Sequence, residues 1–505
     1  MKLRELVDLI PNAVVQGNID IDIEIKGISN HSQRVSPGDL FVCISGIPGY
    51  QVDRHPYAKD AVRAGAVAVV AERGVDVHDV PVIFVKNSRH ALAVLCAHFY
   101  GYPSSELKLI GVTGTNGKTT TSHMIEAIFR YAGHKTGLMG NIGTKIGDTL
   151  YKTDINTQEP PVLQANLRRM ADAGCAYAVM EVTSQGIDAG RVIGCDFRTA
   201  VFTNVTQDHL DYHGTMDNYI AAKGLFFSRL GNGFHADPKT RKFAVLNADD
   251  QASAVFQKLT AAHVLTYGIR EEADVRAEDI RLSARGTTFR VVTYKGTSEM
   301  RIGMVGTFNV YNALAAIATG LVEGLTLETI RDGLASLPGV PGRLEMVDEG
   351  QPFPVLVDYA HTPDGLDNVL RAVRAFADKK VITVFGCGGD RDRSKRPVMG
   401  RIAAEYSDYV IVTSDNPRSE PPERILKDIE EGLRQKQYSA DKYELLEDRA
   451  AAIERAIAMA SAGDVVVIAG KGHETYQITK NGTIHFDDRE VAREAIRKRQ
   501  VGVSG

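Results

Sequence analysis

Short apolar runs alternate with helix-like segments along the whole 505-residue chain, and this alternation constrains the fold more than any other feature. Strands that alternate with helices form α/β layers. Hydrophobic residues make up 44% of the chain and charged residues 24%, which excludes a disordered or fibrous protein. The sequence therefore predicts an α/β protein.

Two turn-rich stretches, residues 101–105 and 337–342, interrupt this alternation. The second contains two prolines and two glycines within six residues, which is typical of a break between folded parts. We therefore expect three domains, over residues 1–105, 106–340 and 341–505, each of ordinary domain size.

The overall charge is close to balanced, with 59 basic and 63 acidic residues and a net charge of −4. No overall basic field attracts nucleic acid, so we expect no nucleic-acid partner. The five cysteines contain no C-x-x-C pair, which favours a reducing compartment. Residues 1–10 carry charges inside their apolar stretch, unlike a secretion signal, and no apolar tract approaches the ~20 residues of a membrane span. We expect a cytoplasmic protein without a membrane span.

Four apolar runs in the last third of the chain are each followed at once by a polar or glycine-rich segment. The runs are residues 354–357, 381–385, 409–413 and 464–469, and the segments are 358–363, 386–391, 414–418 and 470–474. Ligands of open parallel sheets bind at the carboxyl ends of the strands. One such loop is commonly only a structural turn, but four that carry Asp, Arg, His and Glu predict a single binding site in a Rossmann-like domain.

The strongest local signal is residues 109–121, where an apolar run enters a glycine-rich turn and then a helix-like segment. Backbone N–H groups of such a turn converge on phosphate oxygens, and the helix N-terminus favours negative charge. Lys118 supplies a positive charge for the phosphates, and the Thr119 hydroxyl can ligate Mg²⁺. A purely structural turn is the alternative. We predict an ATP site in a central P-loop-type domain with a mainly parallel sheet, formed by Gly114, Thr115, Asn116, Gly117, Lys118, Thr119 and Thr120.

A carboxylate, Glu181, ends the next buried run, where it can hold or position a metal ion. The chain contains no Asn-Lys-x-Asp segment for reading guanine, which argues against a GTPase. The phosphate loop alone defines the ligand and not the reaction, because kinases, motors, switches and ligases all use it.

The variant loop over residues 113–120, together with Glu181 and residues 204–214, resembles the Mur ligases, which are ATP-dependent, amide-forming enzymes of peptidoglycan precursor synthesis. The resemblance extends over nearly the whole chain and includes residues 39–42, 49–53, 306–312, 339–343 and the four loops of the last domain. Residues 414–418, Ser-Asp-Asn-Pro-Arg, resemble the motif of the family members that add meso-diaminopimelate.

The resemblance implies an activity. ATP would phosphorylate the D-Glu carboxylate of UDP-MurNAc-L-Ala-D-Glu, and the amine of meso-diaminopimelate would attack the acyl phosphate. The smaller N-terminal α/β domain would bind the UDP substrate, the central domain ATP and the C-terminal domain the amino acid. The family expectation for the assembly is a monomer.

The resemblance also assigns roles to individual residues. Lys118, Lys223 and His209 would be catalytic, and Thr119, Glu181, His209 and Lys223 would hold Mg²⁺, with Lys223 converted to a carbamate by CO₂. From the residues alone, Lys223 is a lysine on a helix face and His209 a structural histidine. Asn309, Asn312, Arg343 and Asp358 would bind ATP, although helix capping also explains the two asparagines.

The remaining implied sites concern the other two substrates. The UDP substrate would bind at Ser32, Asn156, Thr157, Thr183 and Arg191, although residues 156–159 and 181–185 depart from the usual family pattern. Arg391 and Arg418 would grip carboxylates, because guanidinium groups bind carboxylates bidentately. A surface salt bridge is the alternative for Arg418. The full set predicted for the amino acid is Arg391, Asp415, Asn416, Pro417, Arg418, Gly470 and Glu474.

Two other functions are compatible with the phosphate loop. A folylpolyglutamate synthetase would share it, but would leave the amino-terminal part and residues 415–418 unexplained. A nucleotide-dependent switch would need no second substrate site, so the four polar loops argue against it.

Overall fold

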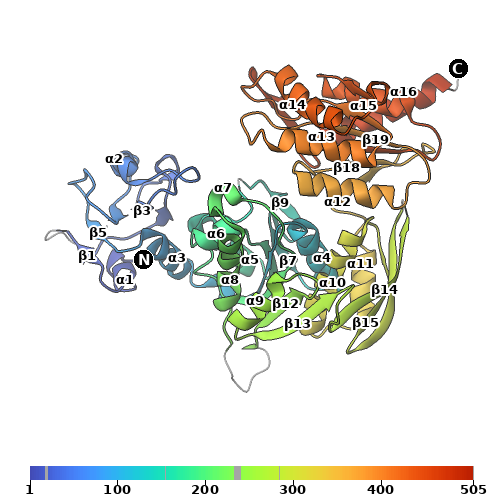
Figure 1. Cartoon of the computed structure of the whole chain (residues 1–505). Coiled ribbons are helices and arrows are strands. Elements are labelled where there is room, and N and C mark those ends of the chain that lie inside the picture. The colour runs from blue at the N-terminus through green and yellow to red at the C-terminus, as the bar shows by residue number, and fades with distance from the viewer. Residues whose placement is uncertain (17–20, 154, 233–239, 284, 504–505) are drawn as a thin grey trace. The chain divides into compact units, whose positions relative to one another are not determined.

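In the computed structural model the chain forms mainly parallel sheets covered by helices (Figure 1). It divides into two compact units. The structure describes residues 1–16, 21–153, 155–232, 240–283 and 285–503. The first unit comprises Met1–Tyr267 and Ala318–Leu325, and the second comprises Gly268–Ile317 and Thr326–Gly505. The α/β class expected from the sequence is confirmed.

The first unit begins with a small sheet in the strand order β1–β5–β4–β3–β2, in which β2 to β5 are parallel and β1 is antiparallel to β5. Its elements are α1 (Leu3–Val7), β1 (Val14–Val15), β2 (Gly27–Ser29), η1 (Ser32–Arg34), β3 (Asp39–Val42), η2 (His55–Tyr57), α2 (Ala58–Arg63), β4 (Ala68–Ala71), β5 (Val82–Phe84), α3 (Ser88–Phe99) and η3 (Pro103–Ser105).

The larger sheet of the first unit has the strand order β13–β12–β11–β6–β10–β7–β8–β9. Its strands are parallel from β13 to β7, and β8 and β9 add an antiparallel edge. The elements are β6 (Lys108–Thr113), α4 (Lys118–Tyr131), β7 (Thr136–Met139), β8 (Thr144–Ile146), β9 (Thr149–Tyr151), α5 (Pro160–Asp172), β10 (Tyr177–Glu181), α6 (Ser184–Asp188), β11 (Phe197–Phe202), α7 (Leu210–His213), α8 (Met216–Ser228), β12 (Phe243–Asn247), α9 (Ala252–Leu259) and β13 (His263–Gly268).

The second unit contains three antiparallel strands, β14 to β16, and a sheet in the order β17–β18–β22–β19–β20–β21, which is parallel except for β17. Its elements are β14 (Val275–Ser283), β15 (Gly286–Thr293), β16 (Gly296–Ile302), α10 (Thr307–Val322, whose last residues belong to the first unit), α11 (Leu327–Ala335), β17 (Glu345–Val347), β18 (Val355–Asp358), α12 (Pro363–Arg374), β19 (Val381–Phe385), α13 (Lys395–Tyr406), β20 (Tyr409–Val412), α14 (Pro422–Gln435), η5 (Ala440–Lys442), β21 (Tyr443–Leu445), α15 (Arg449–Met459), β22 (Val465–Ala469), β23 (Tyr476–Thr479), β24 (Gly482–His485) and α16 (Asp488–Val503).

The four apolar runs expected as strands in the last third of the chain are β18, β19, β20 and β22, with ends that differ from the expectation by at most one residue. These strands are neighbours and parallel, so the four polar segments leave the sheet at one edge, as predicted. The helix expected after Thr362 is α12, and the Thr362 hydroxyl accepts a bond from the Gly365 N–H as its N-cap.

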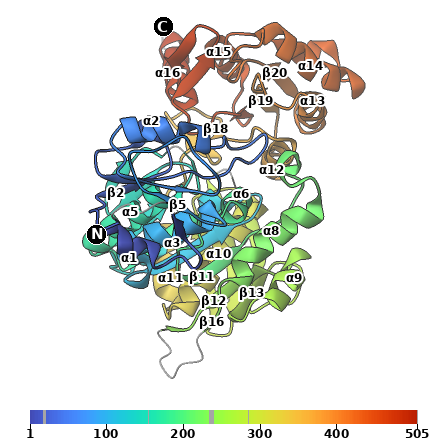
Figure 2. The same ribbon diagram turned by 90° about the vertical axis from the view of Figure 1, so that its left-hand side faces the viewer.

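Helices cover both faces of the six-stranded sheet of the second unit. A hydrophobic core lies between the helices and the strands on each face. Side chains of α12, α13 and α14 pack on one face, and those of α15 and α16 pack on the other. Figure 2 shows α13 and α14 on one side of β19 and β20, and α15 and α16 on the opposite side. Because both faces are covered, the central strands are mostly apolar, and their ends are the places open to ligands.

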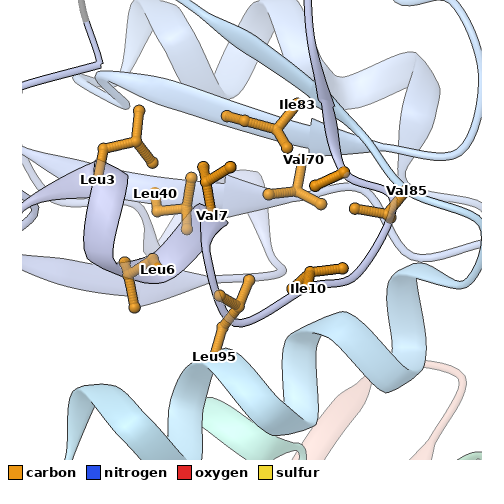
Figure 3. Close-up of a pocket in the computed structure, with 10 residues that line it drawn as sticks. Leu3, Leu6, Val7, Ile10, Leu40, Val70, Ile83, Val85 and Leu95 are labelled. Atoms are coloured by element: carbon orange, nitrogen blue, oxygen red, sulfur yellow. The ribbon is translucent and has the colours of Figure 1, made fainter.

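A small pocket in the amino-terminal sheet lies between α1, the strands and α3 (Figure 3). It is lined by Leu3, Leu6, Val7, Ile10, Ala13, Leu40, Val70, Ile83, Val85 and Leu95. These side chains are hydrocarbons, so the pocket belongs to the hydrophobic core and offers no donors for a polar ligand. Within the ranges that the structure describes, no helix is long and apolar enough to cross a membrane.

Candidate functional site

The glycine-rich loop of the first unit joins β6 to α4, as the sequence predicts. Gly117 precedes α4 with φ of 86°, a left-handed conformation that glycine adopts without strain. At Gly114, where φ is 151°, an added Cβ would collide with the Thr203 hydroxyl oxygen and lie 3.0 Å from the Asn204 nitrogen. The loop therefore passes so close to the end of β11 that only glycine fits at position 114.

Two residues outside the predicted set hold the loop in place. The Asn204 carbonyl and side-chain oxygens accept bonds from the N–H groups of Thr115 (2.8 Å) and Asn116 (2.9 Å). The hydroxyl groups of Thr115 and Tyr219 lie 3.0 Å apart. Asn204 follows an apolar run and was detectable as a polar strand end, whereas a tyrosine in a helix carries no signal of this kind.

Two predicted catalytic lysines meet at one backbone oxygen of this loop. The Gly114 carbonyl accepts bonds from Nζ of Lys118 (2.9 Å) and from Nζ of Lys223 (3.1 Å), and Lys118 also donates to the Thr115 carbonyl. Lys223 is 1% exposed and lies over the Tyr219 ring. Burial, reinforced by the nearby charge of Lys118, lowers the Lys223 pKa well below its ordinary value. Lys223 is thus a buried amine biased toward its neutral form, and not a helix-surface lysine.

His209 belongs to the same electrostatic environment. Its backbone is left-handed, with φ of 53°, and its Nε2 lies 3.4 Å from a carboxylate oxygen of Asp208. Burial and the charges of Lys118 and Lys223 lower its pKa, and Asp208 opposes this shift. A neutral imidazole of this kind can ligate a metal ion.

Glu181, at the end of β10, is buried beside the first turn of α4. Its Oε1 accepts bonds from the Thr119 hydroxyl (2.8 Å) and the Asn141 N–H (2.9 Å), and its Oε2 accepts one from the Asn156 amide (3.3 Å). Adjacent oxygen ligands of an octahedral Mg²⁺ ion lie about 3 Å apart, because each is 2.0–2.1 Å from the metal. The Thr119 and Glu181 oxygens fit such an ion.

Across the described ranges, no three His, Cys, Asp or Glu side chains form a ready-made metal cluster. An ion at Thr119 and Glu181 would therefore take its remaining ligands from phosphate, water or a modified side chain. Mg²⁺ binds in this way in nucleotide sites, where it keeps several waters and contacts one or two protein oxygens.

The residues predicted for the UDP substrate fall into two connected groups. Thr157 donates to the Glu181 carbonyl (3.0 Å) and accepts from the Thr183 N–H (2.9 Å), which joins them to the metal-fitting group. Arg191 donates 2.7 Å to the Glu159 carboxylate. That carboxylate also accepts from Gln51 and Asn30. Ser32, two residues after Asn30, begins η1. Glu159 and Gln51 were missed as site residues, because single polar residues in turns carry no specific signal.

In the second unit, the predicted nucleotide residues form two local groups. Asn309 and Asn312 are buried in α10, where Asn312 donates to the Asn309 side chain (3.0 Å) and Asn309 donates to the Val305 carbonyl (2.8 Å). Asp358 is buried at the end of β18 and accepts bonds from two backbone N–H groups. Burial raises its pKa, and Arg343, which lies over the Tyr359 ring, opposes that shift.

The residues predicted for the amino acid lie on the loops after β19, β20 and β22. Arg418 has a left-handed backbone, with φ of 56°, and its guanidinium donates to the Gly389 carbonyl (2.8 Å). Arg391 donates to the Asp390 carbonyl. Among the described residues, neither arginine forms an ion pair with a carboxylate. Both guanidinium groups keep donors for a ligand.

Carboxylate and amide groups accompany these arginines. Asn416 donates to the Glu474 carboxylate (3.0 Å), and Asp415 is buried beside Gly470, where an added Cβ would lie 3.0 Å from its oxygen. The backbone of Pro417 packs so closely on Gly389 that a side chain there would collide with it. Lys471 and Gln477 also bond to this group, and both were missed because a buried lysine or glutamine looks like a surface residue in a sequence.

A phosphate loop with a buried carboxylate beside it, and a separate sheet edge with two arginine side chains, are the arrangement expected of a nucleotide-dependent enzyme. Family models agree with this arrangement: the Mur ligase middle domain matches residues 112–320, the Mur ligase glutamate ligase domain residues 342–472, and the Mur ligase family catalytic domain residues 24–100. The chain belongs to the Mur ligase family.

Similar proteins match over the whole chain. The UDP-N-acetylmuramoyl-L-alanyl-D-glutamate--2,6-diaminopimelate ligase of Geobacillus thermodenitrificans is 51% identical over 502 residues, which cover 99% of this chain and 100% of the relative. The ligase of the same name from Bacillus velezensis is 52% identical over 497 residues, 98% of this chain and 99% of the relative. A solved structure of a ligase of that name is 32% identical, with a TM-score of 0.69 and 99% of both chains covered.

The close approach at Gly114 generates a prediction. We expect Gly114→Ala to raise the dissociation constant for ATP at least tenfold, because the Cβ must displace the loop from the end of β11. The matched control is Gly133→Ala, which also has positive φ, at 85°, but has nothing within 4 Å of the new Cβ. The control should cost about 1 kcal/mol of stability and leave ATP affinity within twofold. Calorimetric titration with ATP and Mg²⁺ measures the affinity of each variant. Equal ATP affinities of Gly114→Ala and Gly133→Ala would contradict the steric account.

Proposed function

We propose that this protein joins meso-2,6-diaminopimelate to UDP-N-acetylmuramoyl-L-alanyl-D-glutamate at the expense of ATP, in peptidoglycan precursor synthesis. The relatives that match the whole chain at 51% and 52% identity carry the name of this ligase. The observation in the molecule that carries the proposal is the edge after β19, β20 and β22, where two guanidinium groups without ion pairs lie on the same loops as Asp415, Asn416 and Glu474.

The chemistry explains why such a protein needs ATP. A carboxylate resists attack by an amine because its leaving group would be oxide. In the proposed sequence, a carboxylate oxygen of D-Glu bonds to the γ-phosphorus of ATP, and ADP leaves. The amine of diaminopimelate then attacks the carbonyl carbon, the bond from that carbon to the phosphate oxygen breaks, and the nitrogen loses a proton. The products are the amide, ADP and phosphate.

The phosphate loop would supply the first step. Backbone N–H groups of residues 114–120 and the charge of Lys118 would hold the phosphates of ATP. Thr119 and Glu181 would hold Mg²⁺, with His209 at a second metal position. The metal would neutralise the charge of two anions brought together. In the second unit, Asn309, Asn312, Arg343 and Asp358 would contact the nucleotide.

Lys223 would act as a carbamate formed with CO₂, and the burial of the amine, which lowers its pKa, supports this part of the proposal. Only a neutral amine can attack CO₂: the nitrogen forms a bond to the CO₂ carbon and loses one proton, and the neutral amine becomes a carbamate anion. The positive charge of Lys118 would compensate the charge of this carbamate. The carbamate oxygens are ligands of the kind that Mg²⁺ prefers.

The last unit would recognise both ends of the incoming amino acid. Diaminopimelate carries a carboxylate and an ammonium group at each end, so two guanidinium clamps have a purpose. Arg391 and Arg418 would bind carboxylates, and Glu474 with Asp415 and Asn416 would accept from an ammonium group. Pro417 and Gly470 would shape the loops.

The UDP substrate would bind at Ser32, Asn156, Thr157, Thr183 and Arg191. We assign it to residues 1–105, ATP to residues 106–340 and the amino acid to residues 341–505. The family model that matches residues 24–100 is the argument against a folylpolyglutamate synthetase, for which the amino-terminal part has no use.

The decisive assay combines purified protein, ATP, Mg²⁺, UDP-MurNAc-L-Ala-D-Glu and a panel of amino acids that includes meso-diaminopimelate and L-lysine. We expect phosphate release to require the amino acid, and kcat/KM for meso-diaminopimelate to exceed that for L-lysine at least 100-fold, since L-lysine lacks the second carboxylate. Product mass identifies the amide. ATP turnover without an amino acid would indicate a switch, and glutamate addition to a folate acceptor would indicate a folylpolyglutamate synthetase.

The role of Lys223 predicts a second result. Lys223→Met should lower kcat at least 100-fold while the melting temperature changes by only a few degrees. In buffer equilibrated with ¹³C-bicarbonate, the unaltered protein should show a bound carbamate signal by ¹³C NMR, and the variant should lack it. The control is Lys258→Met, an exposed lysine of α9, which should keep both the signal and the turnover. Near-normal turnover of Lys223→Met would remove the carbamate from the proposal.

A further inference from the structure

Lys471 is a buried lysine inside the group of loops that the proposed function assigns to the amino acid. It is the second residue after β22, and its side chain is fully buried. A lysine seldom lies in such a place, because removing an ammonium group from water is costly unless the charge is paired and bonded. Its partners therefore indicate what it does.

These partners are two of the residues proposed to contact the incoming amino acid. Nζ of Lys471 donates to Oε2 of Glu474 (2.8 Å) and to Oδ1 of Asn416 (3.2 Å). Nδ2 of Asn416 donates to the same Oε2 of Glu474 (3.0 Å), which closes a triangle of three side chains. The Tyr476 ring lies beside Nζ, with its centroid 5.4 Å away.

The triangle determines how both partners are oriented. Oδ1 of Asn416 accepts from Lys471 and from the Ile478 N–H (2.9 Å), so the amide nitrogen must face Glu474. Both bonds to Glu474 end on Oε2, and this network does not use Oε1. The Tyr476 hydroxyl also interacts with the Glu474 carboxylate.

The loops do not need Lys471 to stay together. Arg449 and Asp488, both fully buried, form a bidentate pair with two distances of 2.7 Å. The same guanidinium donates to the carbonyls of Ser414 (3.2 Å) and Ala469 (3.0 Å), which follow β20 and end β22. Arg449 already joins the two strand ends. The bonds of Lys471 therefore act on the orientation of Glu474 and Asn416.

We propose that Lys471 is a positioning residue for the acceptor amino acid: it holds the Glu474 carboxylate and the Asn416 amide in the orientation that receives an ammonium group. The inference rests on the proposed function, because it assumes that these two side chains contact the amino acid. Without Lys471, Glu474 loses one of the two bonds to its Oε2, and Asn416 loses one of the two donors to its Oδ1. Both side chains must then be ordered when the substrate binds, and this cost weakens binding.

The test compares Lys471→Met, which keeps the length without the charge, with Lys471→Gln, which keeps one donor. The control is Lys498→Met, because Lys498 is an exposed lysine of the same unit that pairs with exposed Glu454. We expect Lys471→Met to raise the KM for meso-diaminopimelate at least tenfold, with kcat and the KM for ATP within threefold of the unaltered enzyme. The KM of Lys471→Gln for meso-diaminopimelate should lie between those of Lys471→Met and the unaltered enzyme. The KM of the control should equal that of the unaltered enzyme.

Each other outcome overturns the proposal. An unchanged KM for the amino acid in folded Lys471→Met would show that Glu474 and Asn416 are oriented without it. A parallel loss of kcat and of every KM, or a failure of both variants to fold, would make Lys471 structural. Failure of the proposed function is separate, because it appears in the unaltered enzyme: if that enzyme prefers another amino acid, the same comparison is made with the preferred one.

Discussion

Parallel pairing of strands is the constraint on which the rest of the structure depends. Because β18, β22, β19 and β20 run in the same direction, the loops that follow them leave the sheet at one edge. The same holds for β6, β10 and β11, whose ends bring the phosphate loop, Glu181 and Asn204 together. Residues far apart in the chain therefore meet without long connections.

Polar side chains at these strand ends bond to one another or to the backbone. In the first unit, Lys118 and Lys223 share the Gly114 carbonyl, and Glu181 is bonded by Thr119 and a backbone N–H. In the second unit, Lys471 pairs with Glu474. Buried pairs of this kind contribute little net stability, because desolvation offsets attraction. Their value lies in holding polar groups in a set orientation, which is what a reaction between two anions and an amine requires.

The sequence predicted most of the fold, because apolar runs, glycine-rich turns and the Thr362 cap are local features. It also predicted that Thr119 and Glu181 would meet, from the phosphate-loop pattern and the family resemblance. The burial of Lys223 and Lys471 and the left-handed backbone of Arg418 could not be read from local pattern, because each depends on packing by distant residues. The bonds of Glu159 to Asn30, Gln51 and Arg191 likewise join segments that no sequence period connects. The three domain boundaries and the individual residue roles stay predictions.

The central claim is that ATP converts a carboxylate into an acyl phosphate before the amine attacks. Oxygen-18 in both γ-carboxylate oxygens of the D-Glu residue of UDP-MurNAc-L-Ala-D-Glu tests this directly, with the released phosphate examined by mass spectrometry after one turnover. The account predicts one ¹⁸O atom in every phosphate, because the oxygen that joined carbon to phosphorus leaves with the phosphate. Phosphate without ¹⁸O, formed while the amide accumulates, would contradict it.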